Sequence, residues 1–283
     1  MIVIADSGSS KTDWLIFDKA GIEISRKQTI GLNPFHVSTS EITDLVQNTF
    51  KNDSFVNEIE KIFFYGAGCS AATRKSEILL ALKVVFFKAK INIESDILGA
   101  ARALFFDKEG VAIILGTGSN TVFYDGKKIV KSIQSLGYQL GDEGSGAVIG
   151  RKILQAYFRK ELDIETEKKL NESFDLRLDK VLENLYKHSA PNRYMASFAK
   201  FAGENIDNIK ISNLVAEVFQ DYFKYQFASL NIDKSVKIGL VGSIAFHFQK
   251  IFCDIAEENS IFIEKILRHP IESLKKFHLT YDL

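Results

Sequence analysis

The sequence is poor in cysteine and proline. It has 2 Cys and 3 Pro in 283 residues, and Cys69 and Cys253 form neither a C-x-x-C pair nor a spaced metal set. A disulfide scaffold, a zinc site and a cysteine-ligated cluster within one chain are therefore disfavoured. We interpret both cysteines as small buried hydrophobes. Because Ser/Gly-rich tracts are lacking too, we expect the whole chain to be folded.

An excess of either charge is also lacking. The chain balances 36 Lys and Arg against 36 Asp and Glu, which leaves no net charge to hold a nucleic-acid backbone or an anionic membrane surface. Apolar runs such as Val111–Leu115 are too short to cross a bilayer, and no basic segment precedes the apolar start. We therefore predict a cytoplasmic protein that binds neither nucleic acid nor membrane.

The first part of the chain reads as an antiparallel meander of three short strands, followed by alternating helices and strands. The predicted elements are strands over 1–6, 13–18, 22–27, 61–65 and 91–95, and helices over 38–50 (capped by Ser38 and Ser40), 73–88 and 97–105. A chain of 283 residues exceeds what one hydrophobic core usually supports, so a second lobe is expected.

The same order of elements begins again at Val111. The predicted elements are strands over 111–115, 121–125, 128–133, 237–242 and 260–265, and helices over 147–160, 176–187, 191–204, 211–230, 243–257 and after Pro270. This repetition predicts two α/β lobes, an N-terminal lobe over 1–106 and a C-terminal lobe with a helical insertion over 107–283. The substrate is expected in a cleft between the lobes.

The turn between the first two strands has the composition of a phosphate-binding turn. Glycine and small hydroxyl residues let backbone N–H groups approach an anion, and lysine and threonine add donors. The residues expected to contact phosphate are Gly8, Ser9, Ser10, Lys11 and Thr12. A Walker A loop is excluded because Ser10 stands where glycine must precede the lysine. An ordinary polar hairpin remains the alternative for this turn taken alone.

A second small-residue turn, Gly116–Asn120, occupies the equivalent place in the second half. It does not match the dinucleotide-binding fingerprint, because Thr121 stands at the third glycine and a strand follows. We expect Gly116, Thr117 and Gly118 to contact phosphate. Two such turns at equivalent positions predict that a polyphosphate is held from both lobes.

Two further motifs lie at helix starts. Gly141–Gly146 opens a helix, and its two carboxylates either bind sugar hydroxyls or cap that helix. Val241–Ser243 is a tight strand-to-helix turn. Asp96 directly follows a predicted strand, where an aspartate often serves as a helix cap.

Together these residues resemble the superfamily of acetate and sugar kinases, hexokinase and actin, and within it the N-acetylglucosamine kinase and BadF/BadG-type ATPase family. Four motifs occur in the family's order and cover nearly the whole chain: D-x-G-x-x-K-T-x-W at 6–14, G-T-G-S-N at 116–120, G-D-E-G-S at 141–145 and V-G-S at 241–243. The resemblance implies two ribonuclease H-like lobes with the actin/hexokinase-like ATPase fold and an interlobe cleft.

The resemblance also implies roles for single residues. Asp96 matches the catalytic aspartate, which accepts the proton of a sugar hydroxyl as its oxygen attacks the γ-phosphorus of ATP. Asp6 matches the residue that holds Mg²⁺, through water, and Gly242 and Ser243 match the adenosine site. The positions implied for the sugar are Asn33, Gly68, Cys69, Gly118, Asn120 and Asp142, with His36 close to Asn33.

The implied activity is that of an amino-sugar kinase that uses ATP and Mg²⁺. The 6-hydroxyl of N-acetylglucosamine is the expected acceptor, with N-acetylmuramic acid, glucosamine or another hexose as alternatives. Homodimers are frequent among related kinases, so the oligomeric state stays open. Ser273 stands where the family commonly has glycine, and we expect the local backbone to differ there.

Three other functions are weighed against this one. A BadF/BadG-type ATPase that is coupled to a partner protein binds an iron–sulfur cluster through cysteines, and Cys69 and Cys253 lack the expected spacing. A sugar-sensing regulator carries a helix-turn-helix, which we do not expect with the first strand predicted from Met1. A scaffold without catalysis is disfavoured by the presence of Asp6, Lys11 and Asp96.

Overall fold

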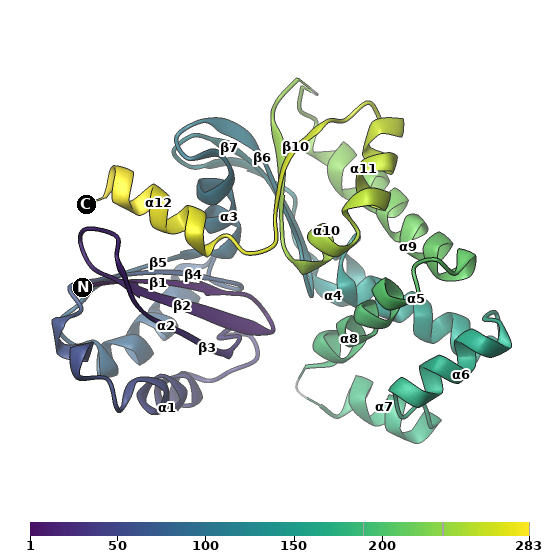
Figure 1. The fold of residues 1–283 in the computed structure, drawn as a ribbon, viewed down its shortest axis with the longest axis horizontal. Coiled ribbons are helices and arrows are strands. Elements are labelled where there is room, and N and C mark those ends of the chain that lie inside the picture. Colours follow the sequence, from purple (N-terminus) through teal and green to yellow (C-terminus); the bar gives the residue numbers. More distant parts are fainter. Residues whose placement is uncertain (189, 234, 283) are drawn as a thin grey trace. The chain divides into compact units, whose positions relative to one another are not determined.

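The computed structural model describes residues 1–188, 190–233 and 235–282. The chain divides into two compact units (Figure 1). The first unit consists of Met1–Glu109, Tyr124–Ile129 and His269–Leu283, and the second of Gly110–Phe123 and Val130–Arg268. The carboxyl-terminal segment thus packs with the amino-terminal unit. The contiguous domains 1–106 and 107–283 remain a prediction, as does the cleft between them.

A five-stranded mixed sheet forms the centre of the first unit, with the strand order β3-β2-β1-β4-β5. Strand β1 pairs antiparallel with β2 and parallel with β4, β2 pairs antiparallel with β3, and β4 pairs parallel with β5. The strands are β1 (Ile2–Ser7), β2 (Lys11–Phe17), β3 (Glu23–Ile30), β4 (Lys61–Gly66) and β5 (Lys90–Ser95). The predicted meander is confirmed.

Helices cover both faces of this sheet (Figure 1). They are α1 (Thr39–Phe50), the 3₁₀ turn η1 (Ser54–Glu58), α2 (Ala72–Val85), α3 (Asp96–Phe105) and α12 (Ile271–Tyr281). Helices α1 and α2 share a core with Trp14 and Phe64, which lie on one face of the sheet. The predicted cap of α1 is present, because Ser38 and Glu41 form a reciprocal capping box, whereas Ser40 lies inside the helix.

The second unit repeats the order of the first sheet. Its five strands run β10-β9-β6-β7-β8. Read in reverse, this is the order of the first sheet, with β6 in the place of β1, β7 of β2, β8 of β3, β9 of β4 and β10 of β5. The strands are β6 (Glu109–Leu115), β7 (Ser119–Asp125), β8 (Ile129–Ser132), β9 (Ile238–Val241) and β10 (Ile263–Leu267). Strand β9 pairs parallel with both β6 and β10. The predicted duplication of one design is therefore confirmed at the level of sheet topology.

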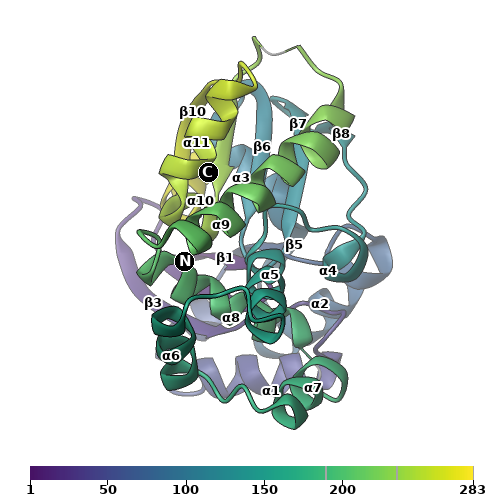
Figure 2. The same cartoon turned by 90° about the vertical axis from the view of Figure 1, so that its right-hand side faces the viewer.

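Most helices of the second unit lie between β8 and β9 in the sequence. They are α4 (Gly137–Leu140), α5 (Gly146–Phe158), α6 (Ile164–Ser173), α7 (Leu178–Tyr186), α8 (Pro191–Glu204), α9 (Ile209–Asp221), the π-helical η2 (Tyr222–Phe227) and the 3₁₀ turn η3 (Ala228–Leu230), followed after β9 by α10 (Ser243–His247) and α11 (Gln249–Glu258). Figure 2 shows α9 running across the second sheet, where Val215 and Phe219 join the core formed by β6.

Sequence reasoning differs from the structure for several helices here, and the short α4 was not predicted. Helix α6 was not predicted, because only Thr166 and Leu170 are buried along it and its pattern is mostly polar. The single helix predicted over 243–257 is two helices, α10 and α11, that meet at Phe248. The helix predicted over 211–230 changes to π and then 3₁₀ geometry after Asp221.

A buried polar chain ties α12 to the first sheet. His278 is 1% exposed and stacks on Phe63 at 3.7 Å between ring centroids. Its Nδ1 lies 2.7 Å from Asp282 Oδ2, so Nδ1 carries the proton and Nε2 accepts from the hydroxyl of Tyr65 at 2.9 Å. Arg102 on α3 in turn donates to that hydroxyl at 2.9 Å. If His278 were protonated, Nε2 would donate to the Tyr65 hydroxyl, and the proton of that hydroxyl would lose its acceptor.

The neutral state of His278 predicts acid lability. Burial lowers the pKa of His278 from 6.5 to about 4; Asp282 opposes this, while Arg102 and Lys61 add to it. Since the folded state binds this proton less readily, the free energy of unfolding is intact above pH 6.5 and falls as the pH drops toward 4. We expect a steeper fall for the wild type than for His278→Gln when thermal unfolding is followed across this range. The exposed His247→Gln should keep the wild-type slope, and equal slopes for all three proteins would contradict the assignment.

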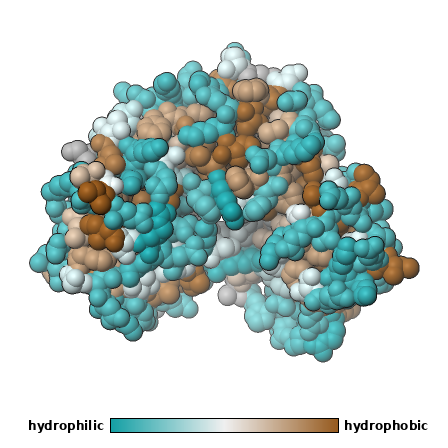
Figure 3. Space-filling model, in the orientation of Figure 1, coloured by the Kyte–Doolittle hydropathy of each residue, from teal (hydrophilic) through white to brown (hydrophobic). Residues whose placement is uncertain are grey.

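The surface drawn in Figure 3 is largely hydrophilic, and its hydrophobic residues lie in several separate patches. Within the part of the chain that the structure describes, no helix is both long and apolar enough to span a membrane.

Candidate functional site

The predicted phosphate turn of the first unit is a tight turn between β1 and β2. Gly8 donates its N–H to the carbonyl of Lys11 at 3.0 Å, and Gly31 donates to the carbonyl of Ser10 at 3.0 Å. A Cβ atom on Gly31 would lie 2.3 Å from the Gly8 carbonyl oxygen and 2.6 Å from Ser9 backbone atoms. The backbone of the turn therefore packs directly on Gly31, where no side chain fits, and this contact fixes its conformation.

Two hydroxyl groups next to this turn, those of Ser7 and Thr12, form hydrogen bonds within the protein. The Thr12 hydroxyl donates to the carbonyl of Ile30 at 3.0 Å and lies 2.8 Å from the Ser7 hydroxyl, which also accepts from the N–H of Leu32. Both side chains are fully buried. The structure places the Thr12 hydroxyl in this internal network, and the contact of Thr12 with phosphate remains a prediction.

Lys11 lies beside two residues that the sequence did not single out. Its Nζ is 2.8 Å from Asp13 Oδ2 and 3.4 Å from His269 Nδ1. Asp13 also accepts from Gln28 at 2.7 Å, and these donors lower the pKa of Asp13 against the effect of its partial burial. His269 is remote in sequence and shows no local pattern, so only the fold could bring it to Lys11.

Asp6 and Asp96 form an electrostatically coupled pair at the carboxyl ends of β1 and β5. Burial, followed by the charges of Asp96 and Asp13, raises the pKa of Asp6 to about 7 against the opposing charge of Lys11. Burial likewise raises the pKa of Asp96 to about 6, although the N–H of Ile97 donates to its carboxylate at 2.8 Å. Asp96 is the first residue of α3, whose N-cap is Ser95, and its charge contributes to the raised pKa of Asp6. Clustered carboxylates with raised pKa values are typical of functional sites.

The predicted sugar-side loops of the first unit contact each other. A Cβ on Gly68, which has φ +79°, would lie 2.4 Å from Asn33 Oδ1. Asn33 is 7% exposed, and its Oδ1 accepts from the N–H of Phe35 at 3.0 Å, which leaves the side-chain NH₂ as a donor. Cys69 is buried, and burial followed by the charge of Asp96 raises its thiol pKa to about 12. Cys253, by contrast, is only partly buried.

The second predicted phosphate turn is joined to the start of α5. Gly116 accepts from the N–H of Gly146 at 2.8 Å, and Thr117 accepts from Ala147 at 3.1 Å. Gly242 of the predicted adenosine motif lies against the same place: with φ +124°, its Cβ would stand 2.2 Å from the Leu115 carbonyl oxygen. Ser243 then opens α10. The fold thus brings 116–118 and 242–243 together.

Asp142 lies directly against this turn. A Cβ on Gly118 would be 2.9 Å from Asp142 Oδ2, so the carboxylate occupies the space that only glycine leaves free. Burial raises the pKa of Asp142 to about 6, the Ser119 N–H lowers it and the charge of Glu143 raises it. Ser119 is 8% exposed and its hydroxyl has no hydrogen-bond partner within the described residues. Asn120 follows at the start of β7.

Each unit therefore gathers its own share of the predicted residues. The first unit holds Asp6, the 8–12 turn, Asn33, Gly68–Cys69 and Asp96, and the second holds 116–120, Asp142 and 242–243. Ser119 was missed, although it stands inside a quoted motif. Asp13, also inside a quoted motif, and the distant His269 were missed as well.

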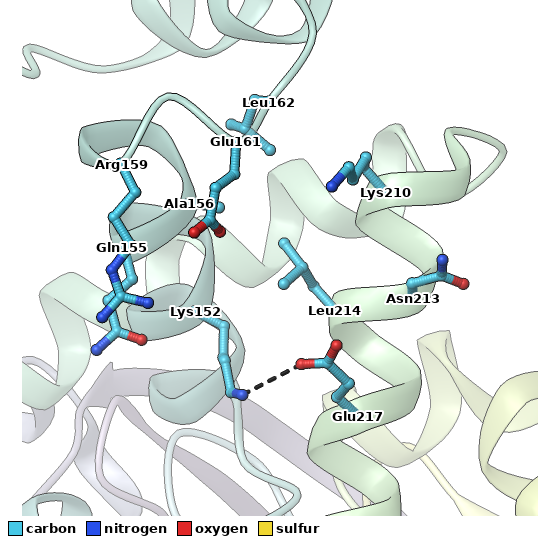
Figure 4. A pocket seen from close by; sticks show the side chains of 10 residues that line it. All are labelled: Lys152, Gln155, Ala156, Arg159, Glu161, Leu162, Lys210, Asn213, Leu214 and Glu217. Atoms are coloured by element: carbon cyan, nitrogen blue, oxygen red, sulfur yellow. Dashed lines mark hydrogen bonds and ion pairs between the residues drawn. The ribbon is translucent and has the colours of Figure 1, made fainter.

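A separate cavity of about 230 Å³ lies between α5 and α9 (Figure 4). Lys152 and Glu217 form an ion pair of 3.2 Å across it. The other residues that line it are Gln155, Ala156, Arg159, Glu161, Leu162, Lys210, Asn213 and Leu214. Its walls are mainly charged and polar, whereas most small-molecule sites are larger and more apolar. None of the predicted site residues belongs to it, so we place the candidate site at the glycine turns.

Two mixed sheets of one repeated strand order, with glycine turns beside clustered carboxylates, define the class of actin/hexokinase-like ATPase folds. The chain belongs to the BadF/BadG/BcrA/BcrD ATPase family, whose model matches residues 5–261. Among curated proteins no relative matches the chain.

Solved structures agree with this assignment. A Porphyromonas gingivalis protein proposed to be an N-acetylglucosamine kinase is 33% identical over 100% of both chains, with a TM-score of 0.93. A Chromobacterium violaceum protein with the same proposed activity is 13% identical over 98% of each chain, at 0.72. A ROK-family glucokinase from Streptomyces griseus, solved with glucose and AMPPNP, is 13% identical over 98% of this chain and 97% of that one, at 0.58. The last two show the fold alone.

Proposed function

We propose that this protein is an ATP-dependent sugar kinase whose acceptor is the 6-hydroxyl of N-acetylglucosamine or a closely related amino sugar. The observation that carries the proposal is the pair Asp6 and Asp96: Asp6 lies near the end of β1, just before the 8–12 turn, and the charge of Asp96 contributes to its raised pKa. The 33% identical P. gingivalis protein supports the amino sugar as the class of acceptor.

Asp96 is the proposed general base. Its pKa of about 6 leaves it deprotonated at neutral pH and still basic enough to take the proton of a sugar hydroxyl. The Asn33 side-chain NH₂ and the Asp142 carboxylate are proposed to bind the sugar, with Gly68, Cys69, Gly118 and Asn120 shaping its surroundings. Gly68 and Gly118 are the positions where the backbone leaves no room for a side chain beside these polar groups.

The nucleotide is proposed to bind at the glycine turns. Residues 8–11 of the first unit and 116–118 of the second supply backbone N–H groups and the Lys11 ammonium for the phosphates, as phosphoryl transfer needs positioning and charge neutralisation above all. Gly242 and Ser243 are proposed for adenosine. The Thr12 hydroxyl supports this turn from inside, since it donates to the carbonyl of Ile30.

The residues present fit a Mg²⁺ ion carried by the nucleotide. Asp13 and Asp96 are oxygen donors whose charges both act on Asp6, and this repulsion favours a divalent cation there. Within residues 1–188, 190–233 and 235–282, no group of three His, Cys, Asp or Glu could hold a metal by itself. Asp6 is therefore proposed to hold Mg²⁺ through water, and the ion would neutralise charge on the β- and γ-phosphates.

The test is ADP release from Mg·ATP, coupled to a spectrophotometric readout, with a panel of sugars. The panel contains N-acetylglucosamine, N-acetylmuramic acid, glucosamine, glucose and N-acetylmannosamine. We expect turnover with an N-acetylated amino sugar, with the phosphate on the 6-oxygen by ³¹P–¹H correlation. Sugar-independent ATP hydrolysis, unchanged by every sugar in the panel, would refute the proposed function and favour an ATPase coupled to a partner protein.

A further inference from the structure

Helix α9 changes to π-helical geometry at its carboxyl-terminal end. At Tyr222 it continues as the π-helical segment η2 (Tyr222–Phe227), which is rare in proteins and frequent at functional sites. Four of its six side chains are buried: Tyr222, Phe223, Gln226 and Phe227. Two of these four are polar, and both lie against the loops of the candidate site.

Tyr222 contacts both β7, just after the 116–120 turn, and the loop 141–146. Its hydroxyl lies 2.8 Å from the Thr121 hydroxyl, and both side chains are fully buried. Thr121 follows the 116–120 turn directly. The ring of Tyr222 also packs on Gly144, where a Cβ would stand 3.0 Å from its Cδ2 atom. Tyr222 therefore fixes the spacing between β7 and the loop 141–146.

Gln226 holds the carboxylate next to Asp142. Its Nε2 donates to Glu143 Oε2 at 2.7 Å, and Gln226 is only 7% exposed. Asp142 itself has φ 59° and Gly144 has φ +82°, so the loop backbone enters the left-handed region twice within three residues. For an aspartate that backbone conformation is uncommon, and such a loop persists only when its surroundings hold it.

Asp142 and Glu143 are adjacent carboxylates with different surroundings. Glu143 and Asp142 repel each other, and only one of them lies against Gly118. An amide donor placed on Glu143 keeps that carboxylate at η2 and leaves the carboxylate of Asp142 at the turn. We propose that Gln226 is a positioning residue for sugar binding, which acts through Glu143 on Asp142, with Tyr222 as the support of the same loop. This inference rests on the proposed function, in which Asp142 binds sugar hydroxyls.

The decisive variant is Gln226→Glu, which has nearly the same size but places a second carboxylate on Glu143. We expect the KM for the sugar to rise about tenfold at mildly alkaline pH, the size of a lost hydrogen bond to a charged group. At lower pH the two carboxylates share a proton, so the KM should return toward the wild-type value. The kcat should change little, because Asp96 lies in the other unit. A purely structural loss would give no such recovery with pH.

Two further variants complete the test. The swap Glu143→Gln with Gln226→Glu restores one donor and one acceptor, and it should recover the wild-type KM at every pH. Gln220→Glu changes the same residue type at an exposed position of α9 and should leave KM unchanged. A wild-type KM in Gln226→Glu, or a swap that does not recover it, would overturn the inference while the proposed function stands.

A measurement that needs no sugar distinguishes a failure of the proposed function from a failure of the role of Gln226. If the wild type phosphorylates no sugar, the proposed function has failed, and amide hydrogen exchange of residues 141–146 then tests the positioning role directly. Exchange should be faster in Gln226→Leu than in the wild type, with residues 8–12 unchanged as the internal reference. Equal exchange of 141–146 in both proteins would overturn the role of Gln226.

Discussion

Asp96→Asn is expected to lower kcat for sugar phosphorylation by about 10²–10⁴-fold, the range that a positioned general base supplies. Asparagine keeps the size of the side chain and can still accept from the N–H of Ile97, as Asp96 does in the wild type. Only the ability to take a proton is lost. Calorimetric titration should give the same affinity for a non-hydrolysable ATP analogue as the wild type.

The pH dependence of the wild type provides a second check on Asp96. Because burial raises its pKa to about 6, kcat should rise with pH through this value and level off above it. The matched control is Asp44→Asn, which makes the same change at an exposed position of α1 and should keep full activity. Wild-type kcat in Asp96→Asn would remove Asp96 from the proposed chemistry.

Gly150→Ala is expected to cause the largest loss of stability among single methyl insertions in the second unit. A Cβ at Gly150 would lie 1.8 Å from the carbonyl oxygen of Met195, so α5 and α8 touch through their backbones at this point. A backbone atom cannot rotate away, and the two helices must separate. We expect the free energy of unfolding to fall by about 3 kcal/mol, near the upper end for overpacked cores.

A second glycine in the same pair of helices is the control for this prediction. At Gly203 on α8 a Cβ would meet only the ring of Phe248 at 3.7 Å, which is ordinary contact. Gly203→Ala should therefore gain up to about 0.5–1 kcal/mol from the lower entropy of the unfolded chain. Urea unfolding followed by far-UV circular dichroism measures both changes. The prediction fails if the two variants shift the midpoint in the same direction.

Several features of the fold could be predicted because they depend on neighbours in the sequence. Short apolar strands alternate with glycine-bearing turns, so the meander and its repetition at Val111 were visible. Likewise a serine before an apolar helical pattern predicts a helix start, and Ser38 does cap α1. The order of the four glycine motifs indicated the family that the chain belongs to.

Other features escaped prediction because nothing local encodes them. Helix α6 buries too few residues to show a periodic apolar face. The break at Phe248 between α10 and α11 occurs without glycine or proline. Thr12 was assigned to phosphate by its residue type, yet contacts with Ser7 and Ile30 direct its hydroxyl inward.

The sequence by itself determined where the acidic side chains of the proposed site stand, Asp6, Asp96 and Asp142, and where the glycines that let backbone approach them stand. These depend on residue type and on backbone conformations that only glycine adopts easily. The tertiary structure decided how those groups behave. Burial raises the pKa values of Asp6 and Asp96, and the charge of Asp96 adds to the effect on Asp6. The partner of Glu143 is Gln226, 83 positions away in the sequence. Electrostatic and hydrogen-bond energies depend on distance through space, which the order of residues along the chain does not specify.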